Sequence, residues 1–286
     1  MRRSLRLPPL TAANLALLVA CAALALPMLY NVAKFSWSTE QGGHGPLVLA
    51  TGLWLLWREF RESDAPLRRP RPLLAAVGIA LLLGVYFIAH VTGILEIEAF
   101  AIYSMFLLGA YLLWGGAILR QLWFPLLYLA LTLPPPDTVV AAVTQPIKIL
   151  ISQVAVSLLH GLGYPIANSG VTIQIAQYEL LVAAACAGLN SILSLSAICL
   201  FYGYLRHRSD FVQLSLIAIA IIPVAILSNF VRVLVLILIT YYFGEAAAQG
   251  FLHNFAGLTM FLAAILSIFA YDEAVERARR RLRRTA

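Results

Sequence analysis

The chain has 286 residues, of which 62% are hydrophobic and only 12% are charged, and long uncharged apolar runs recur along it. This composition excludes an ordinary soluble domain and indicates a polytopic membrane protein. The net charge of +7 does not indicate a nucleic-acid partner, because the basic residues form short clusters between apolar runs, where they orient a chain in the bilayer. The three cysteines, Cys21, Cys186 and Cys199, are widely spaced and predict neither a disulfide framework nor a metal site.

Eight apolar segments are predicted to cross the membrane, since a span needs about 20 apolar residues, or somewhat fewer where the bilayer is locally thin. They cover residues 11–33, 45–57, 73–92, 99–119, 121–133, 182–205, 211–232 and 253–271. The second and the fifth of these segments are short. We therefore expect an all-α polytopic fold, a single membrane domain over 1–286 that ends in a basic cytoplasmic tail, 272–286.

Both termini are predicted to be cytoplasmic, because lysine and arginine concentrate in cytoplasmic loops. In this arrangement only Lys34, Lys148 and Arg232, of the 20 basic residues, lie outside the cytoplasmic segments. It requires the long apolar stretch 211–244 to cross the membrane only once. We therefore expect that stretch to break near Pro223 or Asn229 and to continue as a tilted or membrane-surface segment on the outer side.

The N-terminus has a second interpretation. "MRRSLR" followed by an apolar run resembles a signal peptide, and "LVAC" ending at Cys21 resembles a lipoprotein processing site. However, the apolar run continues as "AALALPMLY" after Cys21. This favours a full membrane span over the shorter apolar region of a signal peptide.

The largest outer segment, 134–181, lies between the fifth and sixth predicted spans. Residues 138–160 predict a helix that lies on or in the outer leaflet and is interrupted at Pro146. Apolar and polar residues alternate from 171 to 176 in "GVTIQIAQYELLV", which predicts a short strand or a hairpin. Together these elements could roof a site that opens to the outer side.

Three reactive residues are predicted at the outer ends of spans: Cys186 on the sixth, Arg232 on the seventh and His253 on the eighth. A cysteine thiolate is a nucleophile and is favoured by a nearby cation or a helix N-terminus. An imidazole can take and return a proton near neutral pH, and the fixed charge of an arginine suits an oxyanion. Gly188 would let a substrate backbone approach the nucleophile closely.

Each of these residues also has a simpler interpretation. A lone cysteine in an apolar helix usually serves only as a small hydrophobic side chain, which is how we interpret Cys21 and Cys199. A histidine at a span boundary often lies at the membrane interface without a catalytic role. Arg232 is harder to explain in this way, because a cation among apolar neighbours is costly unless it is paired or placed at an aqueous cavity. Asn229, three residues earlier, would share a face with Arg232 on a continuous helix and orient its guanidinium, or would simply fill the helix break.

Four motifs in chain order, "GGHGPLVLATGLWLLWR", "ACAGLNS", "PVAILSNFVRV" and "YFGEAAAQGFLHNFAG", together resemble the exosortase/archaeosortase family of membrane-embedded cysteine transpeptidases over residues 37–270. The resemblance implies that the catalytic cysteine, arginine and histidine are Cys186, Arg232 and His253, with no metal or organic cofactor. It also implies an enzyme of the bacterial inner membrane whose site faces the periplasm. Its partners would be membrane lipids and secreted proteins that end in a short motif, typically Pro-Glu-Pro, a transmembrane helix and a basic cluster. The acyl group would pass to an acceptor nucleophile that the sequence does not identify, or to water.

The chain departs from the family pattern beside the nucleophile. Many members have serine after the cysteine and a basic residue at the position of Asn190, whereas this chain has "CAGLN". The departure leaves the subfamily and the recognised motif open, with Asn190 as a candidate hydrogen-bond donor to the substrate. His44, in "GGHGPLV", matches a family motif, and a structural or substrate-gating role is favoured there over direct catalysis.

A non-enzymatic transporter, or a scaffold associated with lipid or polysaccharide, is the alternative function, since it could also place an arginine and a histidine at an outer cavity. A transporter would be expected to carry ionisable residues near the middle of the membrane, and the predicted spans are nearly free of charge. A protease that only hydrolyses would use the same residues as a transpeptidase, and the sequence does not separate the two.

Overall fold

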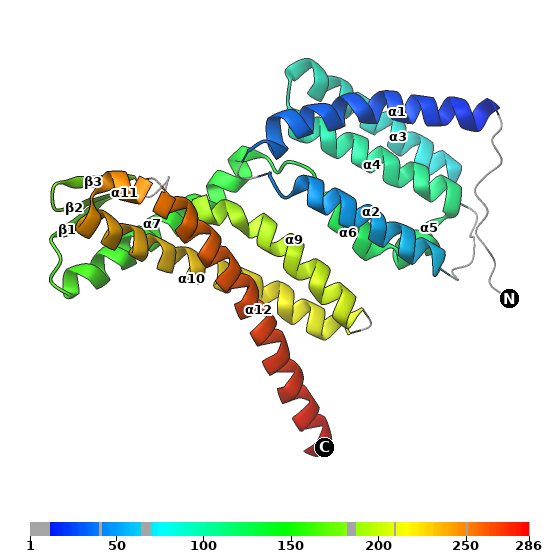
Figure 1. Cartoon of the computed structure of the whole chain (residues 1–286). Helices are drawn as coiled ribbons and strands as arrows, with labels where there is room; N and C mark the ends of the chain where they lie inside the picture. Colours follow the sequence, from blue (N-terminus) through cyan, green and yellow to red (C-terminus); the bar gives the residue numbers. More distant parts are fainter. Residues whose placement is uncertain are drawn as a thin grey trace. The chain divides into compact units, whose positions relative to one another are not determined.

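The computed structural model describes residues 12–39, 42–63, 70–181, 187–208, 210–249 and 251–285. The chain forms two compact units, Met1–Pro136 and Asp137–Ala286, which are described separately below. The described residues are mostly helical and include one small antiparallel sheet (Figure 1).

The N-terminal unit is built from helices, and α1 and α4 share a buried apolar cluster of Met28, Val32, Ala99 and Ile102. Helices α3 and α4 also pack against each other. In the described part of this unit the helices are α1 (Ala12–Val32), which continues as a π-helical turn (Ala33–Trp37), α2 (Gly45–Arg61), α3 (Pro72–Thr92), α4 (Leu95–Trp114), α5 (Gly116–Gln121) and α6 (Trp123–Ala130).

The two short predicted spans, 45–57 and 121–133, correspond to α2 and to α5 with α6, and α2 packs against α6. Helical hydrogen bonds continue through Leu122, whose N–H donates to the carbonyl of Ile118 at 2.9 Å, and this joins α5 and α6 into one nearly continuous segment. The segment runs antiparallel to α2, because Ser63 bonds Gln121 near one end and His44 bonds the Leu131 carbonyl at the other. At 1.5 Å per residue it is roughly 22 Å long, which is shorter than a typical hydrocarbon core of about 30 Å. Its short partner α2 has 17 residues.

The C-terminal unit places a three-stranded sheet beside a set of long helices. Helices α9, α10 and α12 pack against one another, and α7 packs against α10 (Figure 1). Its described elements are α7 (Asp137–Gly161), β1 (Ile166–Ser169), β2 (Thr172–Ile175), β3 (Tyr178–Leu181), α9 (Ala187–His207), α10 (Phe211–Phe243), α11 (Glu245–Gln249) and α12 (Phe251–Thr285).

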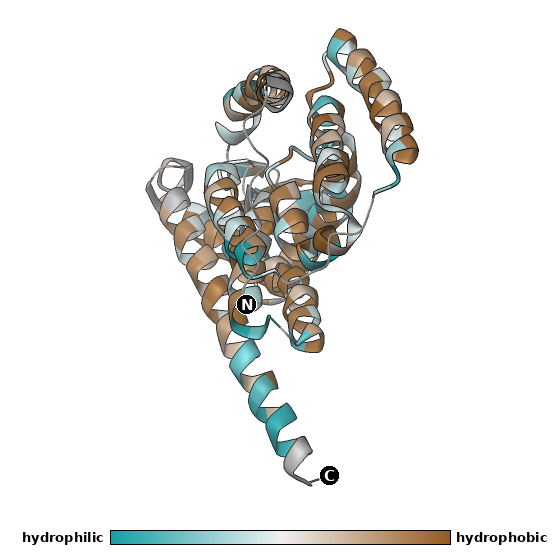
Figure 2. Cartoon of the chain, turned by 90° about the vertical axis from the view of Figure 1, so that its right-hand side faces the viewer, coloured by the Kyte–Doolittle hydropathy of each residue, from teal (hydrophilic) through white to brown (hydrophobic). Residues whose placement is uncertain are grey.

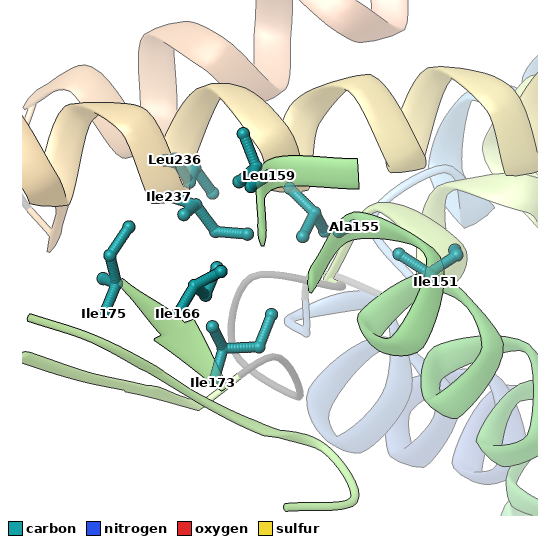
Figure 3. Close-up of a cluster of buried hydrophobic side chains, with 9 residues drawn as sticks. Ile151, Ala155, Leu159, Ile166, Ile173, Ile175, Leu236 and Ile237 are labelled. Carbon is teal, nitrogen blue, oxygen red and sulfur yellow. The ribbon is translucent and has the colours of Figure 1, made fainter. Parts of the chain in front are cut away.

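The predicted strand or hairpin is confirmed and has a third strand. The strand order is β1-β2-β3, with Ile166 opposite Ile175 and Ile173 opposite Leu180. Residues 173 and 175 of β2 are both buried, as the alternation predicts, because successive side chains in a strand point to opposite faces. Figure 3 shows that they meet side chains of α7 and α10, so one face of the sheet is joined to these helices.

Two predicted helix breaks are wrong. Helix α10 is continuous from Phe211 to Phe243 through Pro223 and Asn229, and α7 is continuous through Pro146. A proline removes one backbone hydrogen bond, but ending the helix in an apolar medium would leave several more polar groups without partners. Packing of α10 against α9 and α12 supports the unbroken helix. The stretch 211–243 is therefore one helix of 33 residues.

The protein is a multi-pass membrane protein. Among the described residues, six helices are long and apolar enough to cross a membrane, namely Val19–Trp37, Pro72–Thr92, Leu95–Trp114, Asp137–Gly161, Phe211–Phe243 and Gly257–Leu282. Five of them match predicted spans, and Asp137–Gly161 corresponds to the helix over 138–160 that was predicted to lie on or in the outer leaflet. Figure 2 shows that α12 is apolar along its first part and hydrophilic toward the C-terminus, so the predicted basic tail is a helical continuation of the last span.

Candidate active site

Arg232 lies inside the C-terminal unit, on α10, with only 8% of its surface exposed. It lines a small, partly open cavity between α9, α10 and α12. The polar lining comes from consecutive turns of α10, and the remaining lining is apolar. The lining residues are Leu195, Ala225, Ser228, Asn229, Arg232, Gly257, Met260, Phe261 and Ala264. The buried cation is thus placed at a cavity, one of the two arrangements that make an arginine tolerable in an apolar helix.

Gly257 of α12 is the residue that accommodates the Arg232 guanidinium. A Cβ atom at position 257 would lie 3.2 Å from both Cζ and Nη2 of Arg232. Ordinary contacts between such atoms are about 3.5–4.0 Å, so the guanidinium rests against the helix at a distance that only glycine permits without a shift. The position of the charged group is therefore determined by the packing of α12 on α10.

Asn229 shares the buried face of α10 with Arg232, three residues away, as a continuous helix requires. Its side chain is 3% exposed, and among the described residues neither Oδ1 nor Nδ2 has a hydrogen-bond partner. It therefore makes no hydrogen bond to Arg232. The neighbouring Ser228, in contrast, donates to the Met260 carbonyl at 2.8 Å. Leaving a buried polar group unsatisfied costs about 1–3 kcal/mol, so the amide of Asn229 needs an explanation.

The predicted nucleophile lies outside the described residues, since the description of α9 begins at Ala187, directly after Cys186. Gly188 and Asn190 belong to the first turn of α9, and His253 belongs to the first turn of α12. The side chains of Asn190 and His253 also lie outside the described part. The backbone position of residue 253 is nevertheless informative, because it is four residues before Gly257 and therefore on the same face of α12. Arg232 and position 253 thus lie on helices that pack against each other, and position 253 is one helical turn from Gly257.

A buried polar network fixes the register of α12 about four turns away from Gly257. Asp272 of α12 is fully buried and accepts hydrogen bonds from Tyr202 of α9 at 2.9 Å and from Gln213 of α10 at 2.7 Å. The Nε2 atom of His207 lies 2.9 Å from the same carboxylate. Because these partners have fixed geometry, they prevent α12 from sliding along α10. The network therefore holds Gly257 opposite Arg232.

His44 lies in the N-terminal unit, where the structure gives it a structural contact. Its Nε2 atom is 3.2 Å from the carbonyl of Leu131, and the indole N–H of Trp37 donates to the next carbonyl, Thr132, at 3.1 Å. These carbonyls follow α6, where the last turn of a helix leaves acceptors without intrahelical donors. A Cβ atom at Gly45 would collide with the Trp37 ring, which explains a glycine beside His44. The contacts of His44 and Trp37 therefore hold the end of α6 next to the start of α2.

Sequence reasoning missed Gly257 and the unsatisfied state of Asn229. The signal for Gly257 was present, because "HNFAG" places a glycine one helical turn after His253. Its function depends on the partner helix, however, and the sequence does not say which side chain faces it. In the described ranges, no group of three or more His, Cys, Asp or Glu residues is placed to hold a metal ion.

The chain matches a known protein family. The sequence profile described as transmembrane exosortase matches residues 37–270, which is most of the chain. No match was found among curated proteins or among solved structures. The matched range contains Cys186, Arg232, His253 and His44 and ends before the basic helical tail.

Proposed function

Because the chain belongs to the transmembrane exosortases, a family of membrane protein-sorting transpeptidases, we propose that it cleaves the C-terminal sorting signal of secreted proteins with a cysteine nucleophile. The observation that carries the proposal is the buried guanidinium of Arg232 at a cavity between α9, α10 and α12. Burying a permanently charged group costs free energy and gives no benefit to a passive scaffold. In an enzyme, the same charge can stabilise the negative charge that develops during the reaction.

The proposed reaction begins when the thiolate of Cys186 attacks a peptide carbonyl carbon near the sorting motif. The carbonyl oxygen becomes an oxyanion, which the Arg232 guanidinium stabilises. The C–N bond then breaks, and His253 gives a proton to the amine of the departing tail. The thioester is next attacked by an acceptor amine or by water, and His253 removes the proton of this nucleophile. The thiolate is restored, and no oxidant or reductant is needed.

The cavity suits the proposed stabilisation of charge. Its described lining contains no acidic side chain, so a developing oxyanion would meet a cation and neutral groups only. Arg232 is held by packing against Gly257 rather than by a flexible loop. Such preorganisation is the main reason why buried donors stabilise transition states better than water does. Position 253 is one helical turn from Gly257 on the same face of α12, which supports its proposed role at the same cavity.

The proposed location is the bacterial inner membrane, with the reacting groups at the periplasmic side and both termini in the cytoplasm. The distribution of lysine and arginine supports this orientation. In this orientation α7 does not cross the membrane, although it is long and apolar enough to do so, because another crossing would move the basic tail to the outside. The proposed substrates are secreted proteins that end in a motif such as Pro-Glu-Pro, an apolar helix and a basic cluster.

The proposal is tested with a secreted reporter protein that ends in Pro-Glu-Pro, an apolar helix and an arginine cluster, coexpressed with the chain in a bacterium without an exosortase. The wild-type chain should shorten the reporter, and Cys186→Ala should leave it uncut while the variant accumulates in the membrane. Cys199→Ala is the matched control, because Cys199 is buried within α9 among apolar residues. Normal processing by Cys186→Ala would exclude it as the nucleophile. An uncut reporter with the wild-type chain would instead favour the scaffold function.

A further inference from the structure

The inference concerns the amide of Asn229 in the wall of the α9–α10–α12 cavity. This side chain is 3% exposed and lines the cavity, yet within the described ranges neither of its polar atoms has a hydrogen-bond partner. Its neighbour Ser228 is satisfied by a backbone carbonyl of α12. Buried amides are almost always hydrogen-bonded. The exception at Asn229 therefore points to an occupant of the cavity that carries the missing donor and acceptor.

The chemistry of an asparagine amide limits what this occupant can be. The amide offers one acceptor and one donor side by side, at a fixed spacing. In an extended peptide, the N–H and C=O of a single residue point to the same side and form such a pair of hydrogen bonds in a sheet. An asparagine side chain can replace the partner strand in this pairing. An apolar ligand would leave the amide unsatisfied, and a carboxylate would satisfy only its donor.

We propose that an extended substrate peptide lies across the open side of the cavity and that Asn229 pairs with the N–H and C=O of one substrate residue. The proposal rests on the proposed function and adds the binding mode of the substrate backbone. Arg232 lies one turn further along α10 on the same face, so a carbonyl of an adjacent substrate residue is presented to the guanidinium. Asn229 is thus a substrate-positioning residue.

The key variants are Asn229→Leu and Asn229→Ala. Leucine has the same branched shape and the same number of side-chain heavy atoms as asparagine but no polar atoms, so it removes a buried unsatisfied group and should maintain or raise thermal stability. Alanine removes the amide without filling the cavity, so a loss that is common to both variants cannot be due to steric blocking. The matched control is Ser152→Ala in α7, because Ser152 is also fully buried and without a hydrogen-bond partner among the described residues, but does not line the cavity.

The experiment uses the full chain and the Pro-Glu-Pro reporter and measures two quantities. The first is the rate of tail removal by each single variant. The second is the amount of uncut reporter that copurifies when the same substitution is combined with Cys186→Ala. Both Asn229 variants should lower the rate and the retention by about tenfold or more, since a lost pair of hydrogen bonds has roughly that effect. Ser152→Ala should change neither, and the melting temperature of Asn229→Leu should not fall.

Three results would overturn the inference. Wild-type cleavage by Asn229→Ala would show that the amide is not used, and its cavity partner would then be water. Slow cleavage with full retention of uncut reporter would show that Asn229 does not hold the substrate. If the wild-type chain does not cleave the reporter, the proposed function is at fault, and retention alone decides the inference. Equal retention by the wild-type chain and both Asn229 variants would then overturn it.

Discussion

Gly257→Ala is the most direct test of how the protein positions its buried cation. The added methyl group would lie 3.2 Å from Cζ and Nη2 of Arg232. This contact is shorter than ordinary contacts of about 3.5–4.0 Å, so the guanidinium must move by a few tenths of an ångström. The rigid backbone of α12 cannot yield instead, because the polar network at Asp272 fixes its register.

The expected effects on stability and on activity differ in size. Alanine is favoured over glycine in a helix interior by about 1 kcal/mol, which offsets the cost of displacing the guanidinium, so the variant should stay folded. A displacement of 1 Å in a catalytic group can reduce a rate about a hundredfold, so a displacement of a few tenths of an ångström should reduce cleavage severalfold. Slower cleavage at an unchanged melting temperature is then due to the displaced guanidinium.

The assay compares cleavage of the Pro-Glu-Pro reporter with the thermal stability of each purified variant. Gly84→Ala in α3 and Gly109→Ala in α4 are matched controls, because a Cβ atom at either position would have no neighbour within 4 Å. Both controls should gain similar helix stability and should cleave at the wild-type rate. Wild-type cleavage by Gly257→Ala would refute the reasoning that the guanidinium must rest against position 257. An equal slowing in the two controls would show that the effect is not local.

Three further predictions concern Arg232, His44 and the topology. Arg232→Lys keeps the charge but loses the planar guanidinium, so cleavage should fall about a hundredfold or more while uncut reporter still copurifies with the variant. An unchanged cleavage rate with lost copurification would instead make Arg232 a residue that docks the substrate. His44→Phe loses the hydrogen bond to the Leu131 carbonyl, so the free energy of unfolding should fall by about 1–3 kcal/mol while the cleavage rate per folded molecule stays constant. A large loss of that cleavage rate would indicate a catalytic role for His44. Single cysteines introduced into 34–44, 134–181 and 244–252, on a background without native thiols, should be labelled from the periplasm. Labelling of 244–252 from the cytoplasm alone would contradict the proposed orientation.

Properties that depend on neighbouring residues along the chain were predictable. Uncharged runs of about 20 residues determine where membrane helices form, because backbone polar groups in lipid must be satisfied within the same segment. The alternation at residues 171–176 likewise predicted the strand whose Ile173 and Ile175 are buried. The single crossing that charge counting favours for 211–244 stays a prediction. Arg232 was recognisable because a cation is conspicuous in an apolar segment.

The two helix breaks were mispredicted because proline was judged by its local effect alone. In α10 the lost hydrogen bond at Pro223 is outweighed by packing on α9 and α12, and the sequence does not state that these helices are neighbours. The short helices α2 and α5–α6 present the same difficulty, since their pairing depends on contacts between residues far apart in the chain, such as His44 with Leu131.

The roles of single residues were likewise predictable only in part from the sequence. Sequence motifs indicated the family, which the profile match confirms, and they singled out Arg232 and the position of His253. Only the tertiary structure places Gly257 against the guanidinium, leaves the Asn229 amide unsatisfied in a cavity wall and directs His44 to a helix end. The physical reason is that propensity and hydropathy act over a few residues of one segment. Steric fit and hydrogen-bond satisfaction, in contrast, are properties of the groups that two segments bring together.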